Sequence, residues 1–112
     1  MSVYKNIIIS FDDCSVQSYL NLLHEGYVFI RHQSGQTVSK TEWTPIITSM
    51  FDAMREEKLK FKENRCIYEN EDSLVIHSIG PFPDGTKQAI MAVCTLSIGK
   101  IVKTESGATR ID

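Results

Sequence analysis

The stretch from Leu74 to Ser106 reads LVIHSIGPFPDGTKQAIMAVCTLSIGKIVKTES, with strand-like runs separated by two short turns. Asp84-Gly85 and Ile98-Gly99 supply residues that favour tight hairpin turns. A third turn, at Glu71-Asp72, joins this stretch to an earlier run of the same character. Strands joined by such short turns are antiparallel neighbours. The sequence therefore predicts a four-stranded meander over residues 59–69, 74–82, 87–96 and 101–106.

These turns also predict which residues lie opposite one another. If the loops contain two residues each, Ala92 lies opposite His77 on one neighbouring strand and opposite Glu105 on the other. Tyr68 and Cys94 share that face, and both faces of the meander are largely apolar. Helices can cover only one of them, and a small monomeric sheet usually keeps its other face polar. We therefore expect a homodimer formed through the uncovered face.

The first half of the chain is predicted to be mostly helical. The spacing of apolar residues favours helices over residues 3–11 and 16–23, the second one stopping at Gly26. Residues 27–32 alternate in the manner of a short strand. Helices that precede a run of strands indicate an α+β fold, in which the helices pack on one side of the sheet.

The clearest helix signal begins at Ser39. Ser39 and Glu42 have the spacing of a capping box, and an apolar stripe at helical spacing follows from Trp43 to Met54. Pro45 lacks the N–H that a helix interior requires. Either the first turn of this helix is distorted, or the regular helix begins at Thr44 with Pro45 in its first position.

Length and charge narrow the class of protein. The 112 residues suffice for one domain, residues 1–112, with a core of its own. Twelve basic and fourteen acidic residues give a net charge of −2, so we expect neither nucleic acid nor a membrane as a partner. The sequence shows no signal peptide, and three unpaired cysteines favour a reducing compartment, hence the cytoplasm. The scattered histidines and cysteines predict no metal site, and we expect no cofactor.

Several segments, taken in order, resemble the nuclear-transport-factor-2-like superfamily, and most closely its small bacterial SnoaL-like proteins. The likeness lies in residues 29–32 (FIRH), 39–43 (SKTEW), 68–77, 83–86 (PDGT) and 99–102 (GKIV). The resemblance implies a cone: a curved antiparallel sheet wrapped around N-terminal helices, enclosing a pocket and usually dimeric through its outer face. The superfamily includes isomerases, dehydratases, hydrolases and non-catalytic binding or assembly domains, so the fold does not settle the function.

His77 and Glu105 are the candidates for chemistry. In the register above they flank Ala92 on one face, where a carboxylate near an imidazole favours general-base catalysis. The alternative interpretation is a polar contact across the dimer face. The carboxylate and tyrosine arrangement of a ketosteroid isomerase has no counterpart in this sequence.

The other candidates concern the pocket wall. They are Tyr68, Trp43, Arg31, Phe29 and Cys94. Arg31 could hold an anionic group, although a solvated strand end is the alternative. The sequence thus predicts a binder of a small, mostly apolar molecule. Its rivals are an isomerase, dehydratase or hydrolase acting on a polyketide- or steroid-like substrate, and a structural or assembly domain.

Overall fold

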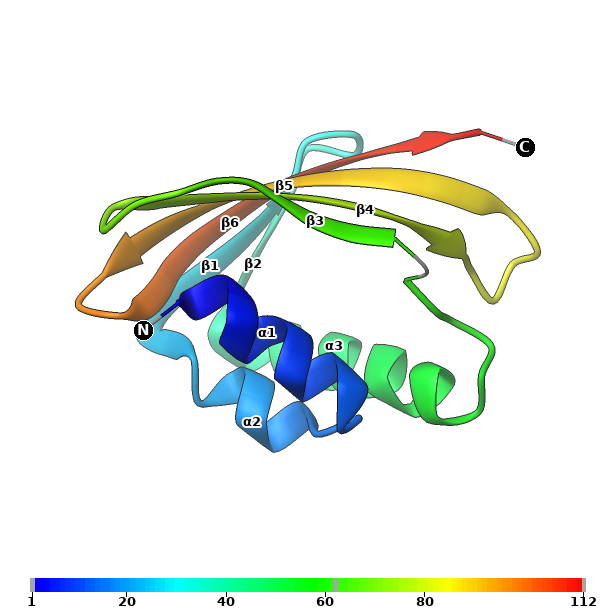
Figure 1. Ribbon diagram of the computed structural model, residues 1–112, viewed down its shortest axis with the longest axis horizontal. Helices are drawn as coiled ribbons and strands as arrows, with labels where there is room; N and C mark the ends of the chain where they lie inside the picture. Colours follow the sequence, from blue (N-terminus) through cyan, green and yellow to red (C-terminus); the bar gives the residue numbers. More distant parts are fainter. Residues whose placement is uncertain (1, 62, 112) are drawn as a thin grey trace.

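The computed structural model describes residues 2–61 and 63–111. A curved sheet arches over three helices, which all pack against its concave side (Figure 1). The helices are α1 (Val3–Asp12), α2 (Val16–Leu20) and α3 (Lys40–Arg55). The strands are β1 (Leu23–Arg31), β2 (Gln36–Ser39), β3 (Glu63–Glu69), β4 (Ser73–Pro81), β5 (Lys87–Ser97) and β6 (Lys100–Arg110).

The sheet has the order β2-β1-β6-β5-β4-β3 and is mixed rather than purely antiparallel. The meander from β3 to β6 is antiparallel, as predicted, but β1 runs parallel to β6. The parallel pair arises because the chain enters β1 from α2 and returns to β6 only after passing through α3 and the meander. Strand β2, which the sequence did not predict, forms a short hairpin with β1.

Local sequence explains the helix boundaries. Ser39 accepts a hydrogen bond from the Glu42 backbone, and the Glu42 carboxylate accepts one from the Ser39 backbone, which confirms the capping box. Helix α3 begins at Lys40 and continues through Pro45, so it does not start at Thr44. The predicted end of α2 is wrong, because the helix stops at Leu20 and Gly26 lies within β1.

The register of the meander differs by one residue from the predicted one. Phe82 donates its backbone N–H to the Thr86 carbonyl, so Pro83-Asp84-Gly85 is a three-residue loop, with Gly85 at a φ of 87°. A turn closed by a left-handed glycine is a common three-residue hairpin loop. As a result, His77 lies opposite Met91 and not opposite Ala92.

Two bulges account for the remaining differences between the predicted and the observed register. An irregularity between Thr95 and Leu96 places Glu105 opposite Val93 rather than Ala92, although the turn itself has the predicted two-residue loop. A second irregularity lies between Cys66 and Tyr68 in β3. Because side chains alternate between the faces of a sheet, these one-residue shifts put His77 and Glu105 on the convex face, while Ala92 and Cys94 point inward.

Candidate ligand-binding site

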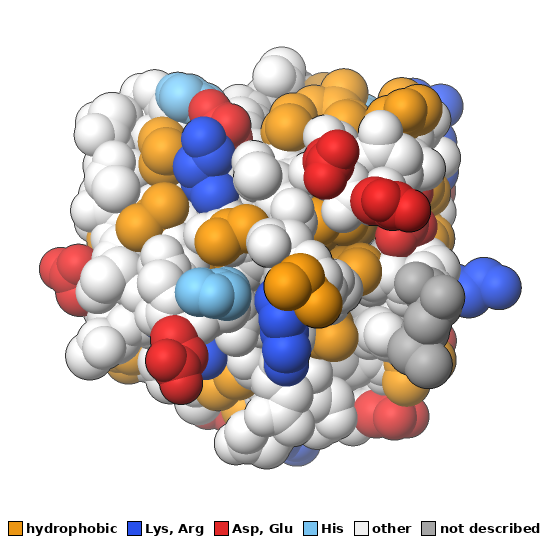
Figure 2. Space-filling model, turned by 90° about the vertical axis from the view of Figure 1, so that its left-hand side faces the viewer, with side chains coloured by type: hydrophobic (Ala, Val, Ile, Leu, Met, Phe, Trp, Pro, Cys, Tyr) orange, Lys and Arg blue, Asp and Glu red, His pale blue; other side chains and the backbone are white. Residues whose placement is uncertain are grey.

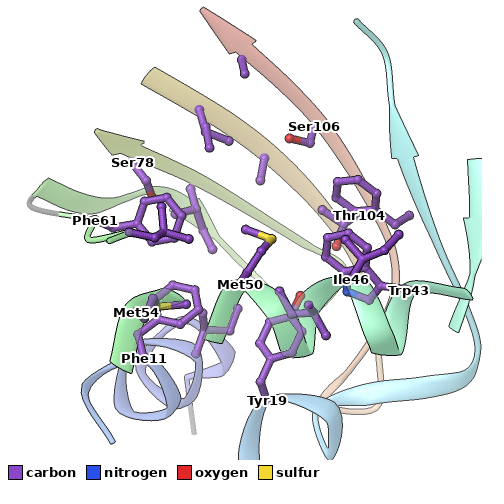
Figure 3. Close-up of a pocket in the computed structure, with 18 of the residues that line it drawn as sticks. Phe11, Tyr19, Trp43, Ile46, Met50, Met54, Phe61, Ser78, Thr104 and Ser106 are labelled. Carbon is purple, nitrogen blue, oxygen red and sulfur yellow. The ribbon is translucent and has the colours of Figure 1, made fainter. Parts of the chain in front are cut away.

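A cavity of about 440 Å³ lies between the concave face of the sheet and the helices. Figure 3 shows side chains of α1, α2 and α3 pointing into it from below and side chains of the sheet from above. Its central residue is Met50 of α3, which extends toward the sheet. The volume suits a ligand of small-molecule size.

The wall of this cavity is almost entirely apolar. The lining side chains that carry a polar group are those of Tyr19, Arg31, Trp43, Ser49, Ser78, Gln88, Thr104 and Ser106. Arg31 carries the one charge among the described lining residues, and neither a carboxylate nor an imidazole is among them. The wall can therefore bind and orient a ligand, but it offers no ordinary side chain for general acid–base catalysis.

The aromatic part of the wall is built by two neighbouring elements. Phe29 of β1 stacks on Trp43 of α3, with ring centroids 4.0 Å apart and planes 12° apart. Phe29 faces inward through strand alternation, and Trp43 is turned toward the sheet because the cap at Ser39 fixes the start of the helix. Together they form one continuous part of the cavity wall.

One end of the cavity gathers buried polar groups. Tyr19, Trp43 and Thr104 lie together there, and Cys94 Sγ is 3.7 Å from Thr104 Oγ1 (Figure 3). Burial raises the pKa of Tyr19 to about 12, and burial also raises the pKa of the Cys94 thiol. Both groups therefore keep their protons at neutral pH, and Cys94 is not a reactive nucleophile.

Four of the sequence candidates line the cavity. Phe29, Trp43 and Cys94 belong to its wall, and Arg31 reaches it from the end of β1, opposite Ser106 of β6. The Arg31 side chain is largely exposed and makes no ion pair within the described part of the chain, so its guanidinium is available at the rim.

The remaining three candidates lie on the convex face, away from the cavity. Tyr68 is 54% exposed and accepts a hydrogen bond from the Asn70 side chain. His77 Nδ1 lies 3.4 Å from Arg65 Nε, whereas Glu105 Oε1 lies 3.1 Å from His32 Nε2. The predicted His77–Glu105 pair is not formed, because the register places Glu105 opposite Val93 and next to His32.

Sequence reasoning missed much of the helical wall. Ile46, Met50 and Met54 were visible as an apolar helix stripe, a pattern that does not distinguish a packed core from a cavity wall. Phe61 and Phe82 also reach the cavity, and they lie at segment ends where face alternation gives no guidance. Tyr19 was visible only as one apolar position of a short helix.

Known proteins resemble this chain in their three-dimensional fold but not in their amino-acid sequence. No family model matches the chain, and no curated protein is significantly similar to it. An NTF2-like protein of unknown function from Cytophaga hutchinsonii superposes with a TM-score of 0.73 at 13% identity, covering 96% of each chain. The chain has the nuclear-transport-factor-2-like fold.

The other structural neighbours of the chain include one of unknown function and one named as an isomerase. An NTF-2 like protein of unknown function from Burkholderia xenovorans has a TM-score of 0.74 at 9% identity and covers 98% of this chain and 82% of its own. A steroid delta-isomerase from Pseudomonas aeruginosa has a TM-score of 0.70 at 12% identity and covers 96% of this chain and 77% of its own. At such identities the likeness extends to the fold and not to the activity.

None of the helices in the described part of the chain is long and apolar enough to cross a bilayer. Within residues 2–61 and 63–111, no three side chains of the metal-binding types lie close enough together to share a metal ion.

Proposed function

We propose that this protein binds a small, mostly apolar molecule in the cone cavity. The observation that carries the proposal is the cavity itself, about 440 Å³ with an apolar wall on both the helical and the sheet side. A structural domain whose only task is assembly would gain stability by filling this space, because buried voids forfeit packing interactions. An apolar cavity with a few polar groups is typical of ligand-binding sites.

Binding is favoured over acid–base catalysis by the residues of the wall. One structural neighbour is named a steroid delta-isomerase, which makes an isomerase the alternative for this chain. Proton transfer at carbon requires a base, usually a carboxylate or histidine, within hydrogen-bond reach of the ligand. The described lining residues include neither, and His77 and Glu105 lie on the opposite side of the sheet.

We further propose that the ligand carries an acidic group near its outer end. Arg31 is the lining residue with a charge, it is exposed at the rim, and Ser106 lies opposite it with a hydroxyl that can donate a second hydrogen bond. A guanidinium and a hydroxyl side by side favour a carboxylate or sulfonate.

The test uses the single tryptophan of the chain as a reporter. The probe is 1-anilinonaphthalene-8-sulfonate, an apolar anion whose emission rises in a dry site and which accepts energy from Trp43. We expect saturable binding that is lost in Ala92→Phe, which fills the cavity from β5. Ala89→Phe is the matched control, because Ala89 lies on the same strand but faces outward. Equal binding by both variants contradicts the proposal.

The role of Arg31 is tested separately. Arg31→Gln is expected to weaken binding of the sulfonate probe several-fold but to leave the binding of neutral 2-ethylnaphthalene unchanged. Arg31→Gln and the parent chain are compared by circular dichroism, so that a change in folding is recognised. A parallel loss of both probes would show that Arg31 supports the fold rather than the ligand.

A homodimer through the outer face of the sheet is also part of this proposal. Tyr68, Met91 and Val93 are 54%, 44% and 39% exposed on that face, beside the half-buried Val75 and Ile79. Figure 2 views the end of the molecule that carries the β3–β4 and β5–β6 turns, and hydrophobic side chains gather near its upper edge, on the sheet side. An apolar, uncovered sheet face favours a two-fold contact with a second copy.

Sedimentation velocity tests the dimer. Val93→Arg places like charges across a two-fold contact and is expected to give a monomer at micromolar concentration. Ile98→Arg is the matched control, because Ile98 is 99% exposed at the tip of the β5–β6 turn. A parent chain that sediments as a monomer at high concentration contradicts the dimer.

We place the protein in the cytoplasm as the remaining element of the proposal. Cys14, Cys66 and Cys94 are all free thiols, and unpaired cysteines suit a reducing compartment. Fractionation of the source cells with an antibody against the chain tests the location. Recovery from an oxidising compartment contradicts it.

A further inference from the structure

Two buried polar side-chain atoms have no hydrogen-bond partner in the described structure. They are the hydroxyl of Tyr27 and the indole Nε1 of Trp43, in residues that are 1% and 6% exposed. Native proteins leave few buried donors unpaired, because each one loses its hydrogen bonds to water without replacement. An indole N–H can only donate. Trp43 lines the cavity, whereas Tyr27 is not among the lining residues, so the indole N–H is the unpaired donor that a ligand can reach.

The surroundings of these two atoms consist of hydroxyl groups, which can both donate and accept hydrogen bonds. Tyr19 lies close enough to Trp43 and to Tyr27 to interact with both, and Thr104 lies beside Tyr27. Burial raises the pKa of both tyrosines, so their hydroxyls remain protonated at neutral pH. We call Tyr19, Tyr27, Trp43 and Thr104 the donor cluster. Its hydroxyl oxygens can accept, but none of them pairs with Trp43 Nε1 in the described structure, so this N–H is open to an acceptor on a ligand.

Position within the cavity limits the charge of the missing acceptor. Arg31 lies two residues beyond Phe29 on β1, and in register Thr104 is opposite Phe29 while Ser106 is opposite Arg31. Two residues of strand separate the backbone positions of Phe29 and Arg31 by about 7 Å, and the Arg31 side chain is exposed beyond them. An anion buried at that distance from its counter-charge costs far more than a neutral oxygen does. A neutral acceptor therefore fits the closed end, and an anion fits the rim.

We propose that the ligand of this cavity carries a neutral carbonyl oxygen, as in a ketone, ester or amide, which accepts hydrogen bonds from Trp43 Nε1 and the Tyr19 hydroxyl. The Tyr27 hydroxyl, one layer behind, donates to the oxygen of Tyr19. This inference rests on the proposed binding function and adds the chemistry of the buried end of the ligand. It involves no transfer of a proton, since both tyrosines stay protonated.

A matched pair of probes tests the carbonyl. In 2-acetylnaphthalene and 2-isopropenylnaphthalene, a C=O group replaces a C=CH₂ group in the same molecular shape. Quenching of Trp43 gives both affinities, and we expect the ketone to bind roughly tenfold more tightly. The carbonyl stretching frequency of the bound ketone is expected to fall below its value in hexane, because a carbonyl that accepts hydrogen bonds vibrates more slowly.

Single substitutions identify the side chains that donate hydrogen bonds to the carbonyl oxygen of the ligand. Tyr19→Phe removes one hydroxyl, retains the tryptophan reporter and is expected to bring the ratio of the two affinities close to one. Tyr68→Phe makes the same chemical change on the outer face and is expected to keep the tenfold ratio. Trp43→Phe is examined by the carbonyl frequency alone, which is expected to move back toward the hexane value.

The outcomes separate this inference from the proposed function. If both probes bind equally and the carbonyl absorbs as it does in hexane, the carbonyl proposal is overturned while the binding function stands. If the frequency falls but neither Tyr19→Phe nor Trp43→Phe restores it, the assigned donors are wrong and a water molecule takes their place. If neither naphthalene nor the sulfonate probe binds, the proposed function fails and the carbonyl proposal fails with it.

Discussion

The two faces of β5 are alike in residue type and differ in what they contact. The inward residues Ile90, Ala92 and Cys94 line the cavity, and the outward residues are Ala89, Met91 and Val93. Composition gives no hint of which set is which. The register of the strand alone assigns each residue to a face, and a slip of one residue exchanges a cavity wall for an uncovered surface.

The largest expected difference in stability between the inner and the outer face of the sheet is that between alanine substitutions at two glycines. Gly80 faces inward on β4, where a Cβ would lie 1.9 Å from the Lys60 carbonyl oxygen, whereas a Cβ on Gly107 of β6 meets nothing within 4 Å. Because backbone lies in its way, Gly80→Ala is expected to cost more than about 4 kcal/mol of unfolding free energy in urea. Gly107→Ala is expected to be neutral or to gain up to about 0.5 kcal/mol.

A pair of neighbours on β4 gives the next largest effect. Leu74 is fully buried on the inner face, and Val75 is half-buried on the outer face. Leu74→Ala is expected to cost roughly 3 kcal/mol through lost burial and a residual cavity, and Val75→Ala about 1 kcal/mol. Urea unfolding at two protein concentrations sharpens the comparison, since a loss at Val75 that grows with concentration supports the outer-face dimer. Equal losses at low concentration contradict the assignment of faces.

The sequence predicts the elements of this fold better than their register. Strands β3 to β6 and the capped helix α3 follow from local patterns, because turns and caps act over three or four residues. The order of the sheet and the parallel β1–β6 pair depend on contacts between residues far apart in the chain. The loop after Phe82 could have been assigned either two or three residues, and that single residue decided the face of His77.

The sequence predicted those residues of the candidate site whose position does not depend on the register of the strands. Phe29 and Trp43 reach the cavity because bulky aromatic residues on a strand and a capped helix favour the interior. Tyr68, His77 and Glu105 were assigned through an uncertain register, and they lie on the other face. The donor cluster has no sequence signal, because its members come from α2, β1, α3 and β6 and meet only in the folded chain.

The turn that sets the register of β6 provides a smaller effect. Ile98 and Gly99 form its two-residue loop with φ values of 51° and 73°. A β-branched residue is strained at such an angle, whereas asparagine tolerates it and is common at the first position of this turn type. Ile98→Asn is therefore expected to raise the unfolding free energy by about 1 kcal/mol in urea. Gly99→Ala, which introduces strain at the neighbouring position, is the opposite control and is expected to lower it.

The smallest expected effect concerns Glu105 on the outer face. Its pKa also tests the geometry of its contacts with His32 and Lys103. The hydrogen bond from His32 and then the charge of Lys103 lower the pKa of Glu105. A lowered carboxyl pKa stabilises the fold above the ordinary pKa of glutamate, and this contribution is lost as pH falls through the folded-state value. Melting temperatures measured from neutral pH down to about pH 3 should therefore decline less steeply in Glu105→Gln than in the parent chain.

The control is to substitute in turn the two residues that lower the pKa of Glu105, because His32 has the larger effect of the two. His32→Gln is expected to raise the pKa of Glu105, followed by NMR of its carboxyl carbon, by more than Lys103→Gln does. Both His32 and Glu105 face outward, so the pair can form only if β1 and β6 are aligned in the observed parallel register. If neither variant changes the pKa of Glu105, the His32–Glu105 pair does not form in solution. The observed alignment of β1 with β6 then loses its support, and with it the position of Arg31 opposite Ser106 at the rim.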